Sequence, residues 1–386
     1  MAWLGALALA QSLALVVLVI RLLPGRSRRP PVVPVEDQGP PRVSVLLPTF
    51  NEAHRVQPCL DGLMQQGPTV HEILVVDGDS RDGTVALARA AGARDPRVRV
   101  TLEPPLPNGW IGKVWALQVG FEQTSGDWVM NVDADIDPRP GLVAAAIQVA
   151  AELDLSVVSF SPRFDVQNAA EQWLQAALLV TLVYRTGAVP STGVQPAQRV
   201  LANGQCFLAR RDVLLAHGGY SSARRSFSDD VTLARHLAKR GVRVGFLDGS
   251  RLFSVRSYES LGQLWHEWGR SLALKDATPR QRLIMDVVLL ALVQGLPLFA
   301  VLWSLVAWLS GSVLYVPLLL VNSILLTIRV AMLGALAISY SKRYAAYWLS
   351  PLADPLAVVR IIASALRRPT SWRGRSYAQV GTRPVS

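Results

Sequence analysis

Cysteine is scarce in this chain of 386 residues, which contains only Cys59 and Cys206. Two thiols so distant in sequence support neither a disulfide framework nor the paired spacing of a structural zinc site. Acidic residues are also in the minority, with 28 Asp and Glu against 39 Lys and Arg, so the formal net charge is +11. The scarcity of cysteine suits a reducing compartment, and the charge favours a negatively charged partner.

Charged residues of both signs make up only 17% of the chain, whereas hydrophobic residues make up 51%. A typical soluble domain has about 25% charged residues, so this composition predicts long apolar segments. Three such runs occur, at residues 3–23, 284–309 and 315–340. Each is long enough to cross a bilayer, which takes about 20 residues. No basic segment precedes the first run, which favours a retained anchor over a cleaved signal peptide.

Basic residues flank these runs and predict their orientation. Arg21, Arg26, Arg28 and Arg29 end or follow the first run, and Lys342 and Arg343 follow the third. Cytoplasmic flanks carry such positive charge, so we expect residues 42–280 on the cytoplasmic side of a multi-pass inner or plasma membrane protein. Juxtamembrane bases also favour an anionic lipid surface as partner, and no nucleic acid partner is expected. Arg329, inside the third run, is expected to snorkel toward the inner boundary.

These features divide the chain into five predicted parts: a transmembrane anchor (1–24), a linker rich in Pro and Arg (25–41), a cytoplasmic domain (42–280), a transmembrane hairpin (281–341) and a basic interfacial tail (342–386). Segment 345–366 is interpreted as an interfacial helix, because its charged residues would be costly at mid-bilayer. The apolar segment 169–189 is either a buried helix or a helix at the bilayer surface, alternatives that periodicity does not separate.

Strand and helix patterns alternate through the first half of the predicted cytoplasmic domain. Short apolar runs predict strands at 43–47, 72–77, 97–101 and 127–133. Helical patterns fall between them, at 55–65, 84–93 and 114–123. Such alternation is typical of an α/β fold with a mostly parallel central sheet and helices on both faces.

Two aspartates, Asp133 and Asp135, stand at the carboxyl end of the fourth predicted strand. Ligands of open α/β sheets bind outside this end of the strands. Paired carboxylates there suit a hard divalent cation, which prefers oxygen ligands. Taken alone, the Asp-x-Asp pattern is a weak signal and a solvated surface turn would be the better interpretation, because turns also collect acidic residues.

Three further motifs accompany this pair, at 47–52 (Leu-Pro-Thr-Phe-Asn-Glu), 75–84 (Val-Val-Asp-Gly-Asp-Ser-Arg-Asp-Gly-Thr) and 228–233 (Ser-Asp-Asp-Val-Thr-Leu). In this order and at strand ends, the set resembles the family 2 glycosyltransferases, which have the GT-A fold. The resemblance covers about residues 42–275. The glycine pattern of a dinucleotide-binding dehydrogenase does not follow the first strand, which argues against that enzyme class.

The resemblance assigns roles residue by residue. It implies that a nucleotide-sugar donor is bound by Pro48, Thr49, Glu52, Asp77, Lys113 and Asp133. It implies that Asp133 and Asp135 hold Mg²⁺ or Mn²⁺ on the donor diphosphate, and that Asp230, beside Asp229, is the general base. An alcohol acceptor needs a base to take its proton, and the resemblance then implies transfer with inversion at the sugar carbon.

The chain departs from the family pattern in two places. Residues 77–80 read Asp-Gly-Asp-Ser where the family usually has Asp-Asp-Gly-Ser, so Asp79 is a doubtful contact, and Asp82 is expected to cap the following helix. The Gln-x-x-Arg-Trp motif of processive members does not follow Gln263, which argues against a polymerase. Trp268 is interpreted either as a packing residue or as an acceptor or diphosphate contact, and Arg270 as a group that helps to neutralise the diphosphate.

A narrower set of motifs, at 110–113, 268–272 and 372–377, resembles bacterial membrane glycosyltransferases of carotenoid and related isoprenoid-lipid pathways, including cyanobacterial carotenoid 2-O-glycosyltransferases. This resemblance implies transfer of one sugar to a hydroxyl of a hydrophobic lipid acceptor. Two alternatives stay open: transfer to a polyprenyl phosphate, and a membrane scaffold that binds nucleotide without catalysis.

Overall fold

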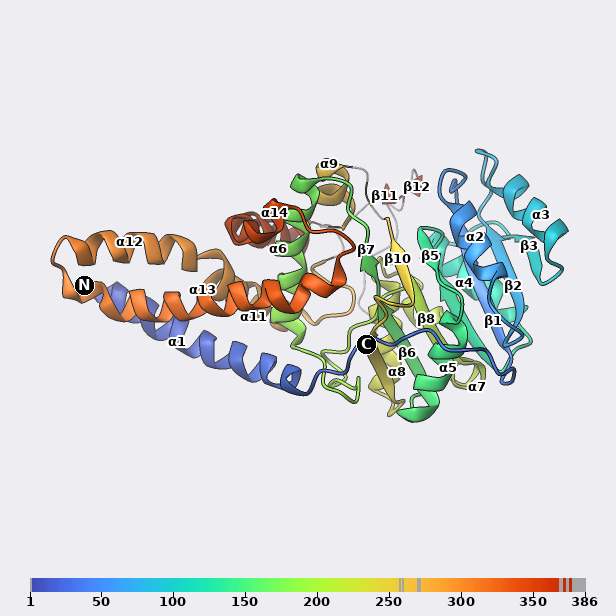
Figure 1. The fold of residues 1–386 in the computed structure, drawn as a ribbon, viewed down its shortest axis with the longest axis horizontal. Coiled ribbons are helices and arrows are strands. Elements are labelled where there is room, and N and C mark those ends of the chain that lie inside the picture. The colour runs from blue at the N-terminus through green and yellow to red at the C-terminus, as the bar shows by residue number, and fades with distance from the viewer. Residues whose placement is uncertain are drawn as a thin grey trace. The chain divides into compact units, whose positions relative to one another are not determined.

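The computed structural model describes residues 2–256, 258, 260–268, 272–367, 371–372 and 375–376. The chain forms two compact units. An α/β unit contains Arg29–Phe164 and Thr192–Ser257, and a helical unit contains Met1–Arg28, Asp165–Ser191 and Tyr258–Arg368 (Figure 1).

The α/β unit is built on a seven-stranded sheet in the order β3-β2-β1-β4-β8-β6-β9. Strand β8 runs antiparallel to both of its neighbours, and the other neighbouring pairs are parallel, which confirms a mostly parallel sheet. The strands are β1 Val43–Thr49, β2 Val70–Asp77, β3 Val98–Leu102, β4 Trp128–Val132, β6 Val157–Ser161, β8 Cys206–Arg210 and β9 Val244–Asp248. A smaller sheet contains β5 Ile136–Pro138, β7 Arg163–Phe164 and β10 Phe253–Val255.

Helices cover both faces of the large sheet, as predicted. Val43, Val45 and Leu47 of β1 share one buried core with α2 Val56–Met64, α3 Thr84–Arg94 and α5 Leu142–Glu152. Leu46 points the other way, because side chains alternate along a strand. On that face α4 Gly112–Glu122 lies so close that a Cβ on Gly120 would stand 2.8 Å from Val76 Cγ2 and 3.0 Å from Leu46 Cδ2. The two remaining helices are α7 Arg211–Ala216 and α8 Asp229–Ala238.

One edge of the sheet collects the ends of several strands. Thr49 at the end of β1 pairs in register with Asp77 at the end of β2, and β4 ends directly before Asp133. Because β8 is antiparallel, its first residue Cys206 pairs with Val132, the last residue of β4. The turn that enters β8 therefore meets the residues that leave β4 at the same edge.

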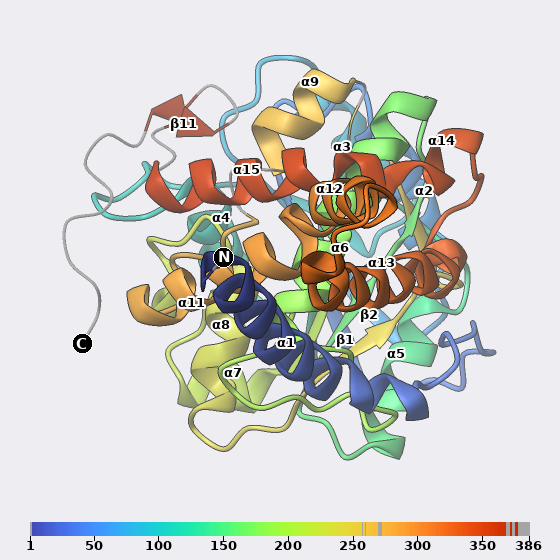
Figure 2. The same ribbon diagram turned by 90° about the vertical axis from the view of Figure 1, so that its left-hand side faces the viewer.

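The helical unit holds the apolar runs. Its long helices are α1 Ala2–Leu22, α6 Ala169–Thr186, α11 Arg280–Leu290, α12 Pro297–Leu309, α13 Val316–Leu336 and α15 Asp354–Leu366. Helices α12 and α13 form an antiparallel hairpin (Figure 1), and α1 packs along α13 (Figure 2). Among the described residues, Trp3–Ser27 and Val313–Ser339 are long and apolar enough to cross a membrane. The second predicted span is instead a pair, Arg280–Gly295 and Pro297–Leu309, bent by 44°.

The apolar segment 169–189 forms helix α6, and the buried alternative holds. Leu178 and Tyr184 are fully buried in a core shared with α1, α11 and α15. The N-cap residue of this helix is Asn168, whose side chain accepts a hydrogen bond from the Glu171 amide.

The prediction for Arg329 is wrong. Its side chain is fully buried, with Nε 2.7 Å from Asp354 Oδ2 and Nη2 donating to Ser350 Oγ. Asp354 also accepts a hydrogen bond from Gln294. The carboxylate partner inside the helical unit compensates the charge of this buried arginine, so its side chain does not extend toward the lipid headgroups. The sequence could not reveal this partner, which lies in the predicted tail.

Candidate active site

A solvent-open pocket with an empty volume of about 480 Å³ lies at the strand-end edge of the α/β unit. Its lining includes five of the residues predicted to bind a donor, namely Pro48, Thr49, Glu52, Lys113 and Asp133. The chain thus brings together the end of β1, the start of α4 and the residue after β4. Phe50, Gly78, Glu103, Gly112, Ala116 and Ala134 complete the lining.

Asp77 lies behind this pocket lining. It is fully buried, and its carboxylate accepts hydrogen bonds from Thr49 Oγ1 at 2.8 Å and from Ser80 Oγ at 2.7 Å. Its position fixes the Thr49 side chain, which does face the pocket. Asp79 is exposed beside Arg81. Asp82 accepts a hydrogen bond from the Thr84 amide, but the N-cap residue of α3 is Gly83, so the prediction that Asp82 caps this helix is wrong by one position.

Lys113 and Asp133 form an ion pair at the pocket wall. Lys113 Nζ lies 2.6 Å from Asp133 Oδ1 and 2.9 Å from Oδ2. A cation in the first turn of a helix opposes the helix dipole, so the adjacent carboxylate compensates an otherwise unfavourable position. Burial alone would lower the pKa of Lys113, but the carboxylates of Asp133, Asp229 and Asp230 outweigh it and raise that pKa. Lys113 is therefore a permanently charged group among acids.

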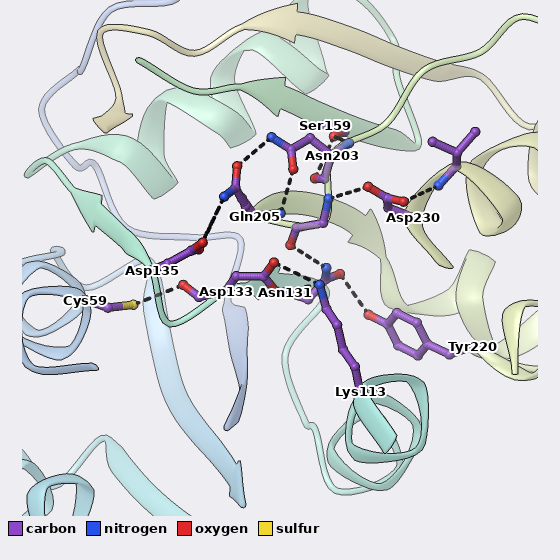
Figure 3. Close-up of polar contacts among 12 residues, drawn as sticks. Cys59, Lys113, Asn131, Asp133, Asp135, Ser159, Asn203, Gln205, Tyr220 and Asp230 are labelled. Carbon is purple, nitrogen blue, oxygen red and sulfur yellow. Dashed lines mark hydrogen bonds and ion pairs between the residues drawn. The ribbon is translucent and has the colours of Figure 1, made fainter. Parts of the chain in front are cut away.

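The Asp135 carboxylate faces the same edge, and among the described residues no arginine or lysine side chain donates a hydrogen bond to it. Gln205 Nε2 lies 3.3 Å from each of its carboxylate oxygens (Figure 3). Burial and the neighbouring Asp133 carboxylate raise the pKa of Asp135 to about 6. This carboxylate would gain stability from a nearby cation.

Asp229 and Asp230 begin helix α8, where the helix dipole favours negative charge. Asp230 Oδ2 accepts a hydrogen bond of 2.8 Å from the Gly204 amide, and Oδ1 accepts one of 2.8 Å from the Val231 amide. Burial and the Asp229 carboxylate nevertheless raise the pKa of Asp230 to about 7. Burial and Asp133 likewise raise the pKa of Asp229. A carboxylate with such a pKa is suited to take a proton at neutral pH.

Gly204 and Gln205 were missed by sequence reasoning, although Gly204 contacts the predicted base and Gln205 contacts Asp135. They belong to the turn 203–205, which leads into β8 and carries none of the four motifs. The backing contacts, from Tyr220 to Asn131 and from Asn131 to the Gly204 carbonyl, were missed as well (Figure 3). The sequence could have indicated these contacts only if the antiparallel pairing of β8 with β4 had been known.

The carboxylates of this site fit a divalent cation that is coordinated partly by the protein and partly by a bound ligand. Within the described ranges, no group of three or more His, Cys, Asp or Glu side chains is arranged to hold a metal ion. Magnesium commonly uses only one or two carboxylates together with substrate phosphates. The Lys113 ammonium interacts electrostatically with four carboxylates, those of Asp133, Asp135, Asp229 and Asp230. Their excess negative charge would repel a diphosphate unless a cation lay between them.

Trp268 lies in the helical unit, in the π-helical segment Leu264–Trp268. Its ring stacks on that of Tyr258, with a centroid separation of 6.4 Å and an interplanar angle of 29°. Arg270 lies outside the described residues. The predicted acceptor or diphosphate contacts of these two residues stay predictions.

The fold and the site define a class of protein. Residues 44–217 match the family model described as Glycosyl transferase family 2. A mannosyltransferase from Pyrobaculum calidifontis, solved in complex with GDP-Man and Mn²⁺, has a similar fold with a TM-score of 0.55 and 20% identity. The superposition covers 94% of this chain and 98% of that one. The GT-A fold is therefore confirmed.

Two curated proteins are similar in sequence to parts of this chain. The chain is 25% identical to 4,4'-diaponeurosporenoate glycosyltransferase of Staphylococcus haemolyticus over 64% of its own length and 65% of that protein. It is 29% identical to undecaprenyl-phosphate 4-deoxy-4-formamido-L-arabinose transferase of Pseudomonas fluorescens over 39% of its own length and 44% of that protein. The matched part spans less than two thirds of the length of each relative.

Proposed function

We propose that this chain is a membrane-anchored, inverting glycosyltransferase. It moves one sugar from a nucleoside-diphosphate sugar to a hydroxyl group of a hydrophobic isoprenoid lipid, with a carotenoid as the favoured acceptor. The observation that carries the proposal is the arrangement at one sheet edge: a pocket lined by Thr49, Lys113 and Asp133, with the carboxylate of Asp230 close to the same lysine. The family 2 domain supports this assignment.

The residues divide the reaction between two sides. On the acceptor side, Asp230 takes the hydroxyl proton as the acceptor oxygen forms a bond to the anomeric carbon. On the donor side, the bond from that carbon to the diphosphate oxygen breaks, and the nucleoside diphosphate leaves with the electron pair. Attack opposite to the leaving group inverts the anomeric carbon. Lys113 contributes a fixed positive charge beside the pocket.

Asp135 and Asp133 would hold a divalent cation, Mg²⁺ or Mn²⁺. When bound, this cation supplies positive charge that stabilises the departing diphosphate. The pKa of Asp135, raised by burial and by Asp133, is consistent with a carboxylate that awaits a cation. The Mn²⁺ named with the Pyrobaculum mannosyltransferase agrees with this choice of cofactor.

A lipid acceptor is supported by the helical unit and by the names of the relatives, which refer to 4,4'-diaponeurosporenoate and to undecaprenyl phosphate. Helix α15 has 13 residues, too few to cross a bilayer, which takes about 20. Its Leu356 and Val359 are about half exposed, with Leu352 just before it on the same apolar face. This face would lie at the cytoplasmic membrane surface, beside anionic lipids.

The test uses the full chain in detergent with labelled nucleotide sugars, Mg²⁺ or Mn²⁺, and a lipid extract as acceptor. Asp230→Asn, which keeps the shape of the side chain and removes the base, is the matched control. Label on a neutral carotenoid that is lost in the variant supports the proposal. Label on an acidic polyprenyl lipid, with much activity kept in Asp230→Asn, supports the alternative suggested by the undecaprenyl-phosphate relative. Nucleotide binding without transfer from any donor would show a non-catalytic scaffold.

A further inference from the structure

The turn Asn203–Gly204–Gln205 touches both sides of the proposed reaction. The Gly204 amide donates to Asp230 Oδ2 at 2.8 Å, and Gln205 Nε2 lies 3.3 Å from both oxygens of Asp135 (Figure 3). Adjacent residues of one turn therefore contact Asp230, the proposed base on the acceptor side, and Asp135, the proposed metal ligand on the donor side. No other pair of consecutive residues does this among the hydrogen bonds described here.

The turn itself is held in place by several hydrogen bonds. Asn203 exchanges two with Ser159: its amide donates to Ser159 Oγ at 2.7 Å, and Ser159 Oγ donates to the Asn203 carbonyl at 3.0 Å. Asn203 Nδ2 donates to Gln205 Oε1 at 3.0 Å, which orients the Gln205 amide. The Gly204 carbonyl accepts from Asn131 Nδ2 at 3.3 Å. Such a supported side chain can fix the direction of the carboxylate that it contacts.

A side chain at the centre of this turn would crowd the Lys113 ammonium. A Cβ on Gly204 would stand 2.9 Å from Lys113 Nζ and 3.7 Å from Asp230 Cβ. The close approach places the Gly204 amide within reach of Asp230 while leaving room for the lysine. The turn is thus packed against the charged groups of the site.

The two acids of the Asp-x-Asp pair receive different partners. Asp133 is neutralised by the Lys113 ammonium, whereas the donor that spans both oxygens of Asp135 is an uncharged amide. An amide orients a carboxylate without cancelling its charge, so that charge remains available to a metal ion.

We propose that Gln205 is a positioning residue that aims the Asp135 carboxylate at the divalent cation, and that the turn 203–205 fixes Asp135 relative to Asp230. This inference rests on the proposed function of the same site. It extends that function to a residue outside the four motifs and names what the residue does.

The test is a binding measurement on the full chain in detergent. Mn²⁺ is titrated by electron paramagnetic resonance in the presence of uridine diphosphate and, in a parallel series, guanosine diphosphate. Gln205→Met keeps the length of the side chain but removes the amide, and we expect the dissociation constant of Mn²⁺ to rise about 10-fold. Gln205→Lys supplies a charged donor that cancels the Asp135 charge, so it should weaken binding more than Gln205→Met. In Gln205→Met the KM for the lipid acceptor should change less than 2-fold.

Two outcomes would overturn the inference. Unchanged Mn²⁺ affinity in Gln205→Met, with an unchanged melting temperature, would show that Gln205 only fills space. A wild-type chain that binds no Mn²⁺ with either nucleotide also overturns it. Sugar transfer by that same wild-type preparation would leave the glycosyltransferase proposal standing, so the two failures are distinguishable.

Discussion

At the scale of single residues, Asp230 sets the expected pH dependence. Burial and Asp229 raise its pKa to about 7, and a general base works only when it is deprotonated. We therefore expect kcat to fall about tenfold per pH unit below pH 7 and to level off above it, because the protonated fraction of Asp230 grows as the pH falls. Steady-state rates between pH 5.5 and 8.5 measure this limb.

The control for this profile is Asp212→Asn, because Asp212 pairs with Arg210 in an exposed position on α7. It should keep the acidic limb, whereas Asp230→Asn should lose both the limb and most of the rate. A wild-type kcat that stays flat from pH 6 to pH 8 would show that deprotonation of Asp230 does not limit the reaction. Asp229 and Asp230 interact, so the observed value belongs to the pair.

Motif-bearing residues could be predicted at this scale, and Gln205 could not. Thr49, Lys113 and Asp133 stand in local patterns that place them at strand or helix ends, and these three do line the pocket. The Gln205 contact joins positions 70 residues apart and depends on strand pairing, which a single sequence does not display. The ion pair between Lys113 and Asp133 could not be predicted either, because its partners lie 20 residues apart on different elements.

At the scale of elements, the distance between α4 and the sheet controls where Lys113 stands. Gly120→Ala would place a methyl group 2.8 Å from Val76 Cγ2, and the stiff valine side chain cannot easily move. Overpacking costs about 1–3 kcal/mol, offset by about 1 kcal/mol of helix propensity. We expect a lower melting temperature and a reduced kcat, because α4 carries Lys113 away from Asp133.

The matched control is Gly334→Ala, the same substitution in helix α13 at a position where no atom lies within 4 Å of the added Cβ. It should leave the melting temperature unchanged or raise it. Differential scanning fluorimetry of the detergent-solubilised chain, with transfer assays on the same samples, compares the two. Equal melting temperatures for both variants would show that α4 tolerates the displacement.

The buried pair of Arg329 and Asp354 joins helices α13 and α15. Arg329→Met leaves the Asp354 carboxylate buried without its cation, and such a loss costs about 3–5 kcal/mol. We expect a large fall in the free energy of unfolding, much of it recovered by adding Asp354→Asn. Thermal unfolding of the single and double variants gives the coupling between the two residues.

Arg343→Met is the control for this cycle, because Arg343 is an exposed arginine of the same unit that donates to the Ala337 carbonyl. It should change the unfolding midpoint little. If the double variant is no more stable than Arg329→Met, the pair is not coupled and the buried contact does not hold α15 on α13.

Element types were predictable where periodicity is local. The predicted strands 43–47 and 127–133 match β1 Val43–Thr49 and β4 Trp128–Val132 to within two residues at each end. The bend of 44° between Arg280–Gly295 and Pro297–Leu309 was not predicted, because hydropathy averages over a run and does not register a π-helical break. The association of α6 with the helical unit was equally hidden, since its apolar face suits either environment.

At the scale of the whole molecule, the charge pattern predicts a membrane orientation that thiol labelling can test. Cys59 and Cys206 are both fully buried, so neither native thiol should react with a membrane-impermeant maleimide. Val313 lies in the connection between α12 and α13 and is 76% exposed. We expect Val313→Cys to be labelled on intact cells, because the basic flanks place this loop outside.

Ala345→Cys, at the exposed first position of α14 Ala345–Trp348, is the matched control on the predicted inner side. It should be labelled only after the membrane is permeabilised. The reverse pattern would place the α/β unit outside the cell, where nucleotide sugars are not made, and would remove the cytoplasmic donor supply on which the proposed function depends.

The antiparallel direction of β8 also has a consequence in time. Asn131 and Gly204, which are hydrogen-bonded in the finished sheet, are 73 positions apart in the chain. A ribosome that adds roughly 5–20 residues per second needs about 4–15 s to make that interval. During those seconds β1, β2 and β4 already exist, while the turn before β8 and Asp230 do not. On the proposed function, the nascent chain has the strands of its donor pocket several seconds before it has the residue that activates an acceptor.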